Sequence, residues 1–590
     1  MAKDATVTET PGSVSPHSRD GPTSTHGDVE KTGEQAYVNG TVTNEGALRN
    51  ENFYTRNGLN MESFKMRSYG YGLIELDRSM KHRHLQMIAI GGSIGAGFFV
   101  GSGSAFVNGG PGWVLIDFMI IGVMMFNVVY ALGELAVLYP VSGGFYTYSV
   151  RFIDPSWGFA MGWNYVFQWL IVLPLELTVA GFVCNYWEAA REVHIGVWIF
   201  VFWAAITILN IFGALGFAEE EFWSSCLKLI TIIVFMIIAV ILVCGGGPKG
   251  GRYDSYWGAR TWHGPEGAFL NGFRGFCSVF VTAAFSFSGT ELVGLAAAES
   301  ANPVKALPSA IKQVFWRITL FYIVGLFLVG LLVYADDPTL IGADNPYEDG
   351  ASMFVLAAKY AGLKGYDSYL NIVIMVSVLS IGASCVYAGS RTLTGLAQQG
   401  YAPKIFTYVD KSGRPLPSVV LHLAAGFLAY IQLDSTGETV FNWLLSLSGL
   451  AALFTWGSIC LSHIRFRQAW ARQGHSVDEI PFQAIFGVTG SWIGLILCII
   501  VLISTLISAI MPPGKTRLAT AYEFFSAWLT VPVILFFWAV GYIWKREGAV
   551  KLDQIDLDTG RRQLDWDAIN AYRAEVATWP KWKRIIKKVW

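Results

Sequence analysis

The sequence predicts an all-α integral membrane protein of twelve transmembrane helices, arranged as two inverted repeats. Of its 590 residues, 53% are hydrophobic and only 14% are charged, whereas soluble domains are about 25% charged. Apolar segments of about 20 residues, the length that crosses a bilayer, recur from residue 86 to residue 545. Two of these segments are interrupted by glycines, at residues 91–97 (GGSIGAG) and 287–291 (FSGTE). Because glycine costs about 1 kcal/mol relative to alanine inside a helix, these interruptions serve a purpose other than helix stability.

Polar segments flank the predicted membrane domain. Residues 1–50 are rich in Ser, Thr, Gly and charge, so we expect a disordered cytosolic tail that cannot bury enough apolar surface to fold. Residues 51–85 end in a basic run (RSMKHRH), and we expect a cytosolic interfacial segment whose cations reach the lipid surface. Residues 546–590 are predicted to form a cytosolic tail, whose basic, Trp-rich end suits an anionic inner leaflet.

Twelve apolar segments make up the predicted domain of residues 86–545. Their approximate limits are 86–106, 112–137, 157–185, 195–216, 221–244, 270–297, 315–335, 368–394, 417–434, 438–463, 488–511 and 521–544. An even number of spans places both termini on one side of the membrane. Ten cations in the segments facing that side assign it to the cytosol: Lys305, Lys312, Arg317, Arg391, Lys404, Lys411, Arg414, Arg465, Arg467 and Arg472. The segment 245–269 weakens this assignment, because it carries Lys249, Arg252 and Arg260.

The two interruptions indicate the internal organisation. Spans one to five (residues 86–244) and six to ten (residues 270–463) each begin with a broken helix, and an odd number of spans inverts the second repeat relative to the first. Residues 488–544 add two further helices. Broken helices persist at membrane depth only where the break faces protein or a polar cavity, and such a pair marks the substrate site of many transporters. The alternative is a packing seam, since small residues let membrane helices approach closely.

The breaks offer complementary binding groups. Free N–H groups at the N-terminus of a half-helix bind anions, which predicts a carboxylate site at Ser93, Gly95, Ala96 and Gly97. Carbonyl groups at the C-terminal ends of the opposing half-helices suit an ammonium, so a zwitterion matches both. Phe285 and Phe287 flank the second break, where an aromatic ring either closes over a substrate or packs against other helices.

Ionisable residues inside spans are functional candidates. Glu291 directly follows the second break and could carry a proton or gate a path; alternatively it bonds to backbone at the edge of a cavity. Lys228 lies seven residues after Glu221, about 10 Å further along its helix. It could snorkel to the surface or act as a buried cation coupled to protons. Glu176 is expected to face the bundle interior, with no role assigned.

Other functional classes lack their signatures. The sequence shows no nucleophile–base pair, metal-ligand cluster or nucleotide motif, so an enzyme is set aside and no cofactor is expected. The net charge of −1 gives no argument for a nucleic-acid partner. The seven cysteines fall in or beside apolar segments without metal or redox spacing, and we interpret them as packing residues.

Several long motifs resemble one family. The strings MIAIGGSIGAGFFVGSG, VFVTAAFSFSGTELVGLAAAES and SRTLTGLAQQGYAPKIFTYVDKSGRPL are similar to those of the yeast amino acid transporter family, within the amino acid–polyamine–organocation superfamily. The resemblance covers about residues 66–590. It implies a LeuT-type 5+5 inverted repeat with broken first and sixth helices. It also implies a permease of the lipid bilayer that imports a broad range of L-amino acids across the plasma membrane, with protons as the coupling ion. An amino acid sensor and an amino acid exchanger are the alternatives.

The resemblance implies roles for individual residues. The substrate's α-carboxylate and α-amino group would be bound at Ser93, Ile94, Gly95, Ala96 and Gly97 and at Phe285, Ser286, Phe287, Ser288, Gly289 and Thr290, with Phe285 as the gate. Ala96 stands where the family often has Thr, so a hydroxyl is lost while backbone contacts remain. Glu291 matches the gating or proton-linked acid, Lys228 a lysine that replaces a sodium ion, and Ser380 a polar contact on the eighth helix.

Further expectations concern selectivity and regulation. Gln168 and Ser448 are candidates for the wall that selects the substrate side chain. By analogy with the family, Lys3 and Lys31 would be acceptors for a ubiquitin ligase that directs endosomal trafficking.

Overall fold

The computed structural model describes residues 37–38, 41–42, 52–56, 58–66, 80–140, 144–264, 267–299, 303–341, 352–433, 437–562 and 566–583. The chain divides into two compact units, residues 1–50 and residues 51–590. In the first unit, strands β1 (Tyr37–Val38) and β2 (Thr41–Val42) pair antiparallel. The rest of the tail for which we expect disorder, with Lys3 and Lys31, lies outside the described residues.

The described residues of the second unit are helical apart from turns and one isolated bridge between Met66 and Asp410. The first part contains α2 (Phe53–Arg56), α3 (His82–Gly91), α4 (Ser102–Leu138), α5 (Tyr146–Phe152), α6 (Pro155–Cys184), α7 (Glu188–Arg191), α8 (Ile195–Ile211) and α9 (Gly213–Val243). The middle part contains α10 (Gly272–Phe287), α11 (Leu292–Ala298), α12 (Pro303–Arg317), α13 (Gly325–Leu332), α14 (Pro338–Ile341), α15 (Met353–Tyr360) and α16 (Tyr366–Gln398). The last part contains α17 (Leu416–Ala425), α18 (Gly437–Arg472), α19 (Gly487–Ile510), α20 (Ala521–Trp528), α21 (Thr530–Lys545) and α22 (Trp566–Thr578).

Shorter turns connect or extend these helices. The 3-10 turns are η1 (Met61–Phe64), η3 (Arg260–His263), η5 (Lys404–Thr407), η6 (Gly426–Leu433), η7 (Val477–Glu479) and η8 (Leu552–Gln554). The π-helical turns are η2 (Gly97–Gly101) and η4 (Ile318–Val324). Such π-turns occur frequently at functional sites.

The expected all-helical membrane protein is confirmed. Eight helical stretches in the described part of the chain are long and apolar enough to cross a membrane, or nine if α20 and α21, bent by 62°, form one span. One stretch, Gly97–Leu138, runs through α4 although Gly110 has φ 77° and ψ 170°, so two helices meet there before Pro111. The apolar helices Ile195–Ile211 and Leu416–Ile431 are shorter.

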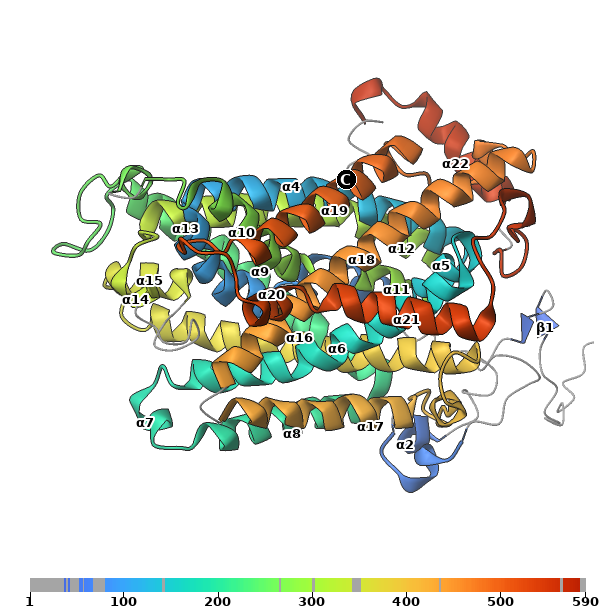
Figure 1. Cartoon of the computed structure of the whole chain (residues 1–590), viewed down its shortest axis with the longest axis horizontal. Helices are drawn as coiled ribbons and strands as arrows, with labels where there is room; N and C mark the ends of the chain where they lie inside the picture. The colour runs from blue at the N-terminus through green and yellow to red at the C-terminus, as the bar shows by residue number, and fades with distance from the viewer. Residues whose placement is uncertain are drawn as a thin grey trace, which may run out of the picture. The chain divides into compact units, whose positions relative to one another are not determined.

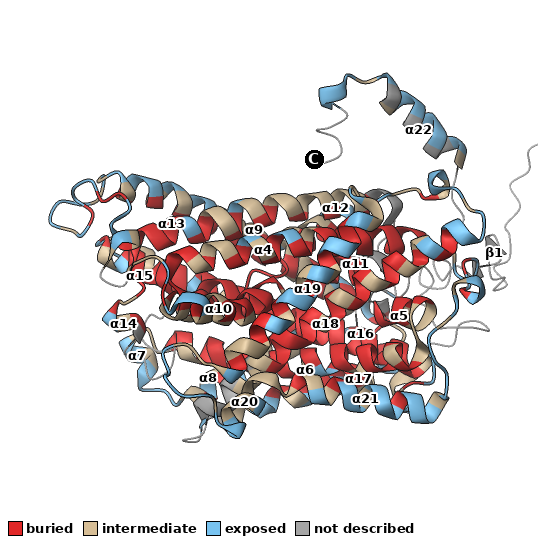
Figure 2. Ribbon diagram, turned by 45° about the horizontal axis from the view of Figure 1, so that its top comes forward, coloured by how far each residue is buried: buried red, intermediate tan, exposed pale blue. Residues whose placement is uncertain are grey.

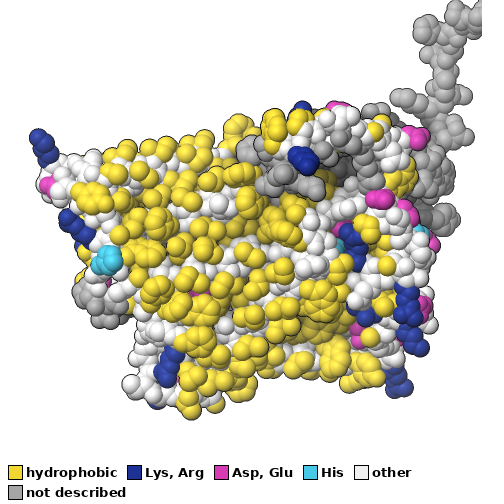
Figure 3. All heavy atoms as spheres, turned by 90° about the horizontal axis from the view of Figure 1, so that it is seen from above, with side chains coloured by type: hydrophobic (Ala, Val, Ile, Leu, Met, Phe, Trp, Pro, Cys, Tyr) yellow, Lys and Arg dark blue, Asp and Glu magenta, His cyan; other side chains and the backbone are white. Residues whose placement is uncertain are grey.

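The outer surface has the character that lipid requires. Large aliphatic side chains remain exposed along the outer faces of α9 and α19, including Ile230, Ile233, Ile237, Ile496, Ile499 and Ile503. On the face shown in Figure 3, apolar side chains cover the middle, and most charged side chains lie toward the two edges of the view. In water such a surface would be unstable, whereas in a bilayer it is the contact surface.

The interior is built from helix pairs that enclose the two breaks. Helix α6 packs along α16, α4 packs along α10, and α3 packs against α9. Helices α6 and α16 lie side by side in Figure 1, and Figure 2 shows that the helices in the middle of the bundle are mostly buried. The broken helices therefore lie among other helices, away from the lipid surface.

The segment just before the membrane domain docks onto the protein. Arg414 donates to Asp410 Oδ2 at 2.7 Å, to the Ile211 carbonyl at 2.5 Å and to Ser63 Oγ at 3.2 Å. Glu62 accepts a hydrogen bond from Lys411 at 2.8 Å, and its lysine partners hold the pKa of Glu62 down at about 2. This segment, predicted to lie at the lipid surface, thus contacts the connection between α16 and α17 through residues 58–66.

The segment after α21 also docks onto the helix ends. The Val550 N–H donates to the Ile153 carbonyl at 2.9 Å, and Arg465 of α18 donates to the Val550 carbonyl. Tyr139, next to the end of α4, donates its hydroxyl proton to the Leu557 carbonyl at 2.7 Å. Residues 547–562 therefore join the ends of α4, α5 and α18.

Candidate substrate-binding site

The two breaks touch each other at the centre of the helix bundle. Helix α3 ends at Gly91 and the chain becomes helical again as η2, while α10 ends at Phe287 before α11. A Cβ atom on Gly97 would lie 2.9 Å from Phe285 Cδ1 and 2.9 Å from Ser286 Cα, so only glycine allows this approach. Gly289 has φ 91° and faces the Gly92 carbonyl oxygen, and side chains rarely adopt that backbone conformation.

Tyr322 of η4 joins the two breaks. Its hydroxyl oxygen lies 2.7 Å from the Ser286 carbonyl oxygen and 3.1 Å from the Ser93 carbonyl oxygen, and it can donate to either. The Phe287 ring stacks on the Tyr322 ring with centroids 4.3 Å apart. The buried tyrosine thus holds one carbonyl from each break near the same hydroxyl group.

A small cavity opens beside the breaks. It is lined by Ser93, Gly95, Gly97, Trp169, Val172, Glu176, Phe285, Ser288 and Ile381. Among the described residues, the N–H groups of Ser93 and Gly95 make no backbone hydrogen bond. They lie in the turn between the end of α3 at Gly91 and the start of η2 at Gly97, so they can bind an anionic group beside the N-terminus of the second half-helix. The cavity therefore combines backbone donors, one carboxylate and apolar walls.

Three buried polar atoms around this cavity have no hydrogen-bond partner in the described part of the chain: Gln168 Oε1, Trp169 Nε1 and Glu176 Oε2. Gln168 also donates through Nε2 to Ser288 Oγ at 2.8 Å, which ties α6 to the second break. Unsatisfied buried polar groups are costly and usually have a functional explanation. A bound polar molecule that donates to the two oxygens and accepts from the indole would satisfy all three.

Two buried cations cap the C-terminal end of α3. Arg317 donates to the Ala89 carbonyl at 2.7 Å and to Thr290 Oγ1 at 2.6 Å, and Lys228 donates to the Gly91 carbonyl at 3.4 Å. The last carbonyls of a helix have no intrahelical partner and carry partial negative charge. Both cations are fully buried. The prediction that Arg317 is a cytosolic cation is wrong, because the end of a helix inside the protein supplies the charge compensation that water would otherwise provide.

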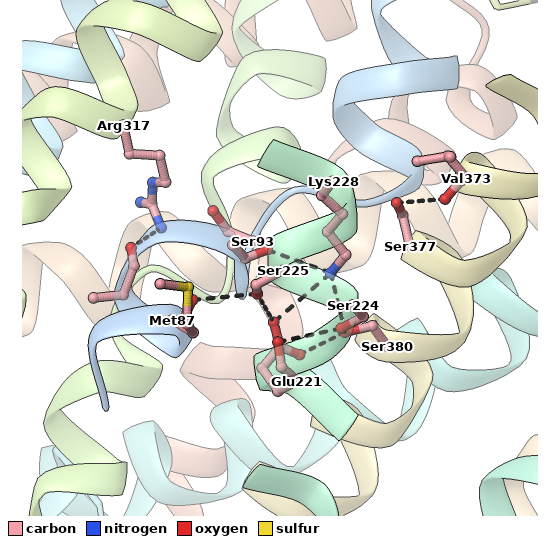
Figure 4. Close-up of polar contacts among 12 residues, drawn as sticks. Met87, Ser93, Glu221, Ser224, Ser225, Lys228, Arg317, Val373, Ser377 and Ser380 are labelled. Atoms are coloured by element: carbon pink, nitrogen blue, oxygen red, sulfur yellow. Dashed lines mark hydrogen bonds and ion pairs between the residues drawn. The ribbon is translucent and has the colours of Figure 1, made fainter. Parts of the chain in front are cut away.

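Lys228 belongs to a buried polar cluster, shown in Figure 4. Its ammonium lies 3.0 Å from Ser380 Oγ and 3.7 Å from Glu221 Oε1. Glu221 accepts hydrogen bonds from Ser380 at 2.5 Å and from Ser225 at 2.9 Å. Sequence reasoning missed Glu221 as a functional residue. Its spacing of seven residues from Lys228, two turns along one helix face, is the signal that could have indicated the pair.

Glu291 is bonded within the protein core. Trp456 Nε1 donates to it at 3.1 Å and the Tyr165 hydroxyl at 3.4 Å. Tyr165 also lines a second small cavity between α5, α6, α16 and α18. Trp169 lines the first cavity, and the Tyr165 and Trp169 rings make an edge contact with centroids 5.7 Å apart. Glu291 thus holds a tyrosine that stands at the boundary of the second cavity.

The predicted site residues fall into three groups. Five line the first cavity: Ser93, Gly95, Gly97, Phe285 and Ser288. Six others lie in the same two breaks without lining it: Ile94, Ala96, Ser286, Phe287, Gly289 and Thr290. The Ser380 hydroxyl bonds in the Lys228 cluster, and its neighbour Ile381 lines the cavity instead. Ser448 is buried beside Gly449, which packs against Val281 and Phe285.

A polar cavity between two broken helices of an all-helical membrane protein is the arrangement of a transporter for a small polar molecule. The chain belongs to the amino acid permease family, whose model matches residues 84–554. Members of this family are transporters and not enzymes.

Named relatives agree with this assignment. The chain is 64% identical to an amino-acid permease of Hypocrea atroviridis over 92% of its own length and 95% of the relative. It is 48% identical to a general amino-acid permease of Saccharomyces cerevisiae, covering 86% and 85% of the two chains. A cationic amino acid transporter of Schizosaccharomyces pombe is 45% identical over 94% and 92%. The predicted family, with a likeness to fungal general amino acid permeases, is confirmed.

Proposed function

We propose that this permease imports a broad range of L-amino acids across the plasma membrane together with protons. The observation that carries the proposal is the buried Lys228, which bonds to the Gly91 carbonyl at the first break and pairs with an acid. A charged ammonium stabilises the end of α3, and its deprotonation removes that support. Because the same break lines the cavity, protonation and substrate binding favour one conformation, which couples them.

Substrate recognition follows from the two breaks. The α-carboxylate binds the N–H groups at Ser93 and Gly95, and the α-ammonium binds carbonyl groups of the second break. The substrate side chain lies against Trp169, Phe285 and Ile381, with Phe285 closing over it. Backbone groups bind the part common to all amino acids, and the surrounding wall is mostly apolar, which supports breadth. The relatives include a general amino-acid permease and a cationic amino acid transporter, which supports a range of substrates.

The same proposal includes the architecture. Twelve spans form when α3, η2 and the part of α4 before Gly110 count as one membrane crossing, the rest of α4 as the second, and α10 with α11 and α20 with α21 as one crossing each. Two sets of five spans, each starting at a break, then form a LeuT-type inverted repeat, with both termini in the cytosol. Of the cations that favour this orientation, Arg317, Arg391 and Arg414 are buried, the last two in ion pairs with Glu299 and Asp410, so the orientation depends on the other seven. Ubiquitin ligation at Lys3 or Lys31 would direct endosomal trafficking.

Uptake measurements test the function. The full chain is expressed in a yeast strain that lacks its own amino acid permeases, and uptake of a panel of labelled L-amino acids is measured at acid and neutral pH, with and without a protonophore. Accumulation of many amino acids, stronger at acid pH and abolished by the protonophore, supports the proposal. Binding without uptake at the cell surface would identify a sensor, and exchange retained under protonophore would identify an exchanger.

A further inference from the structure

The buried face of α9 carries an acid and a base two turns apart. Glu221 and Lys228 both have 0% exposure, and their charged atoms lie 3.7 Å apart. Isolated charges are strongly disfavoured in a protein interior, so each is stable here only with its partner and additional hydrogen bonds. A proton that moves from Lys228 to Glu221 within this pair leaves both groups neutral, whereas a proton that leaves the pair leaves a Glu221 anion beside a neutral amine.

Ser380 of α16 supplies a route for that movement. The Lys228 ammonium donates to Ser380 Oγ at 3.0 Å, and the Ser380 hydroxyl donates to Glu221 Oε2 at 2.5 Å, as Figure 4 shows. When the hydroxyl proton passes to Glu221 and an ammonium proton replaces it on Ser380, an N–H bond breaks and a carboxyl O–H bond forms. The products are a neutral amine, an unchanged serine and a neutral carboxylic acid, so charge and atoms balance.

The surrounding charges give the relay a direction. On the cavity side, Glu176 of α6 lines the cavity and interacts electrostatically with Lys228. On the other side, the chain continues from Glu221 to Glu220, which also interacts with Lys228. Next comes the partly exposed Glu219, paired with Arg83 and with the buried His84. Lys228 lies about 10 Å deeper along α9 than Glu221, so Glu221 is the acid toward the exposed end of the helix.

The relay is also adjacent to the substrate cavity. Ser380 precedes Ile381, which lines the cavity, and Gly91, which Lys228 contacts, begins the first break. A shift of α16 on substrate binding therefore changes the distance between Ser380 and its two partners. Proton transfer through Ser380 and substrate contact with Ile381 therefore depend on neighbouring residues of α16.

We infer that Glu221 is a proton-coupling residue, which receives the proton from Lys228 through Ser380 and releases it at the cytosolic end of α9. The inference rests on the proposed symport and adds to it the exit step and the residue that performs it. Glu221 is therefore essential for net proton movement, while exchange of one amino acid for another across the membrane does not require it.

Transport in proteoliposomes tests this assignment. The purified full chain, as wild type, Glu221→Gln, Glu221→Asp or Glu219→Gln, is reconstituted with a trapped pH indicator. The substrate is the amino acid of the panel that the wild type accumulates most strongly. Proton entry and amino acid entry are recorded together under a pH gradient, and exchange is recorded without one. Glu219→Gln is the matched control, because it removes a neighbouring acid of the same helix that pairs with Arg83 and His84 instead of with Lys228.

The expected result separates coupling from folding. Glu221→Gln leaves Lys228 without its charged partner, so the net proton-driven uptake of each variant is divided by its own exchange rate. This ratio should be about 100-fold or more lower in Glu221→Gln than in the wild type, as expected for loss of a positioned proton acceptor. Glu221→Asp should recover part of the net uptake. An unchanged ratio of protons to amino acid in Glu221→Gln would overturn the inference, as would loss of exchange in both variants, which would indicate a structural role. If the wild type shows no proton-driven uptake, the symport proposal itself fails.

Discussion

Replacing Arg317 by methionine should impair transport without reducing the stability of the protein. Arg317 is fully buried on α12 and makes no ion pair among the described residues. Its two hydrogen bonds go to the Ala89 carbonyl at the end of α3 and to Thr290 in the second break. The Arg317→Met variant keeps comparable bulk and loses both bonds and the charge.

The structure sets the expected size of the effect. An unpartnered buried carbonyl oxygen costs about 1–3 kcal/mol, and Ala89 would be left in that state. Thr290 keeps its own hydrogen bond to the Phe287 carbonyl. The variant also avoids the cost of burying a charge, which is several kcal/mol, so overall stability is maintained. The lost hydrogen bonds instead destabilise the arrangement in which the two breaks are aligned, so the fraction of molecules in that arrangement should drop by about 5- to 150-fold.

Two measurements on the same variant check this reasoning. Initial uptake rates, normalised to the amount of protein at the cell surface, should fall at least fivefold, the lower end of that range. The apparent melting temperature in detergent should stay at the wild-type value. Arg317→Lys keeps a charge but reaches only one of the two acceptors, so its uptake should be intermediate. Wild-type uptake in Arg317→Met would refute the proposed role of Arg317 in positioning the break.

Four further changes give definite expectations. Gly97→Ala places a methyl group 2.9 Å from the second break, so the chain should reach the membrane and show no measurable uptake; normal uptake would mean that the breaks separate freely. Tyr322→Phe removes the hydroxyl that donates to the Ser286 or the Ser93 carbonyl and should slow uptake by about tenfold, from a loss of about 1.4 kcal/mol; uptake at the wild-type rate would count against this role. Glu291→Gln should retain substrate exchange and lose accumulation against a gradient, which labelled uptake with a protonophore control would check. The pKa of Glu62 lies at about 2, below its ordinary value of 4.5, so its ion pairs are fully formed above 4.5 and are lost only as pH falls toward 2. The protection of residues 58–66 against hydrogen exchange, taken relative to the intrinsic exchange rate at each pH, should therefore be the same at pH 7 and pH 5, and a loss of protection in that interval would contradict the docking.

The positions of the helices could be predicted because lipid constrains the sequence strongly. A span must be apolar over about 20 residues, so the limits 157–185 and 488–511 lie close to the observed α6 (Pro155–Cys184) and α19 (Gly487–Ile510). A glycine cluster in an apolar segment indicates either a break or a packing seam, and its occurrence at the start of both sets of five spans favours a break. The helices α5 and α15 were not predicted, because they are short and their stability comes from packing on other elements.

The interior of the site could not be predicted to the same degree. Arg317 lies near the end of a predicted span, where a cation normally reaches water, and only the fold shows that a helix end occupies its surroundings. Tyr322 lies in an ordinary apolar string, and its role depends on two carbonyl groups 36 and 229 residues away in the sequence. These contacts join separate helices, and no local pattern encodes them.

The close spacing of Lys228 and Glu221 has a consequence for the electrical behaviour of transport. Their charged atoms are 3.7 Å apart, about one eighth of a hydrocarbon core of about 30 Å. A proton that crosses the whole membrane gains about 2.3 kcal/mol per 100 mV, so one that moves between these two groups gains at most about 0.3 kcal/mol. The membrane potential therefore changes this transfer by less than a factor of about two, and the voltage dependence of the full cycle must arise as protons enter and leave the pair.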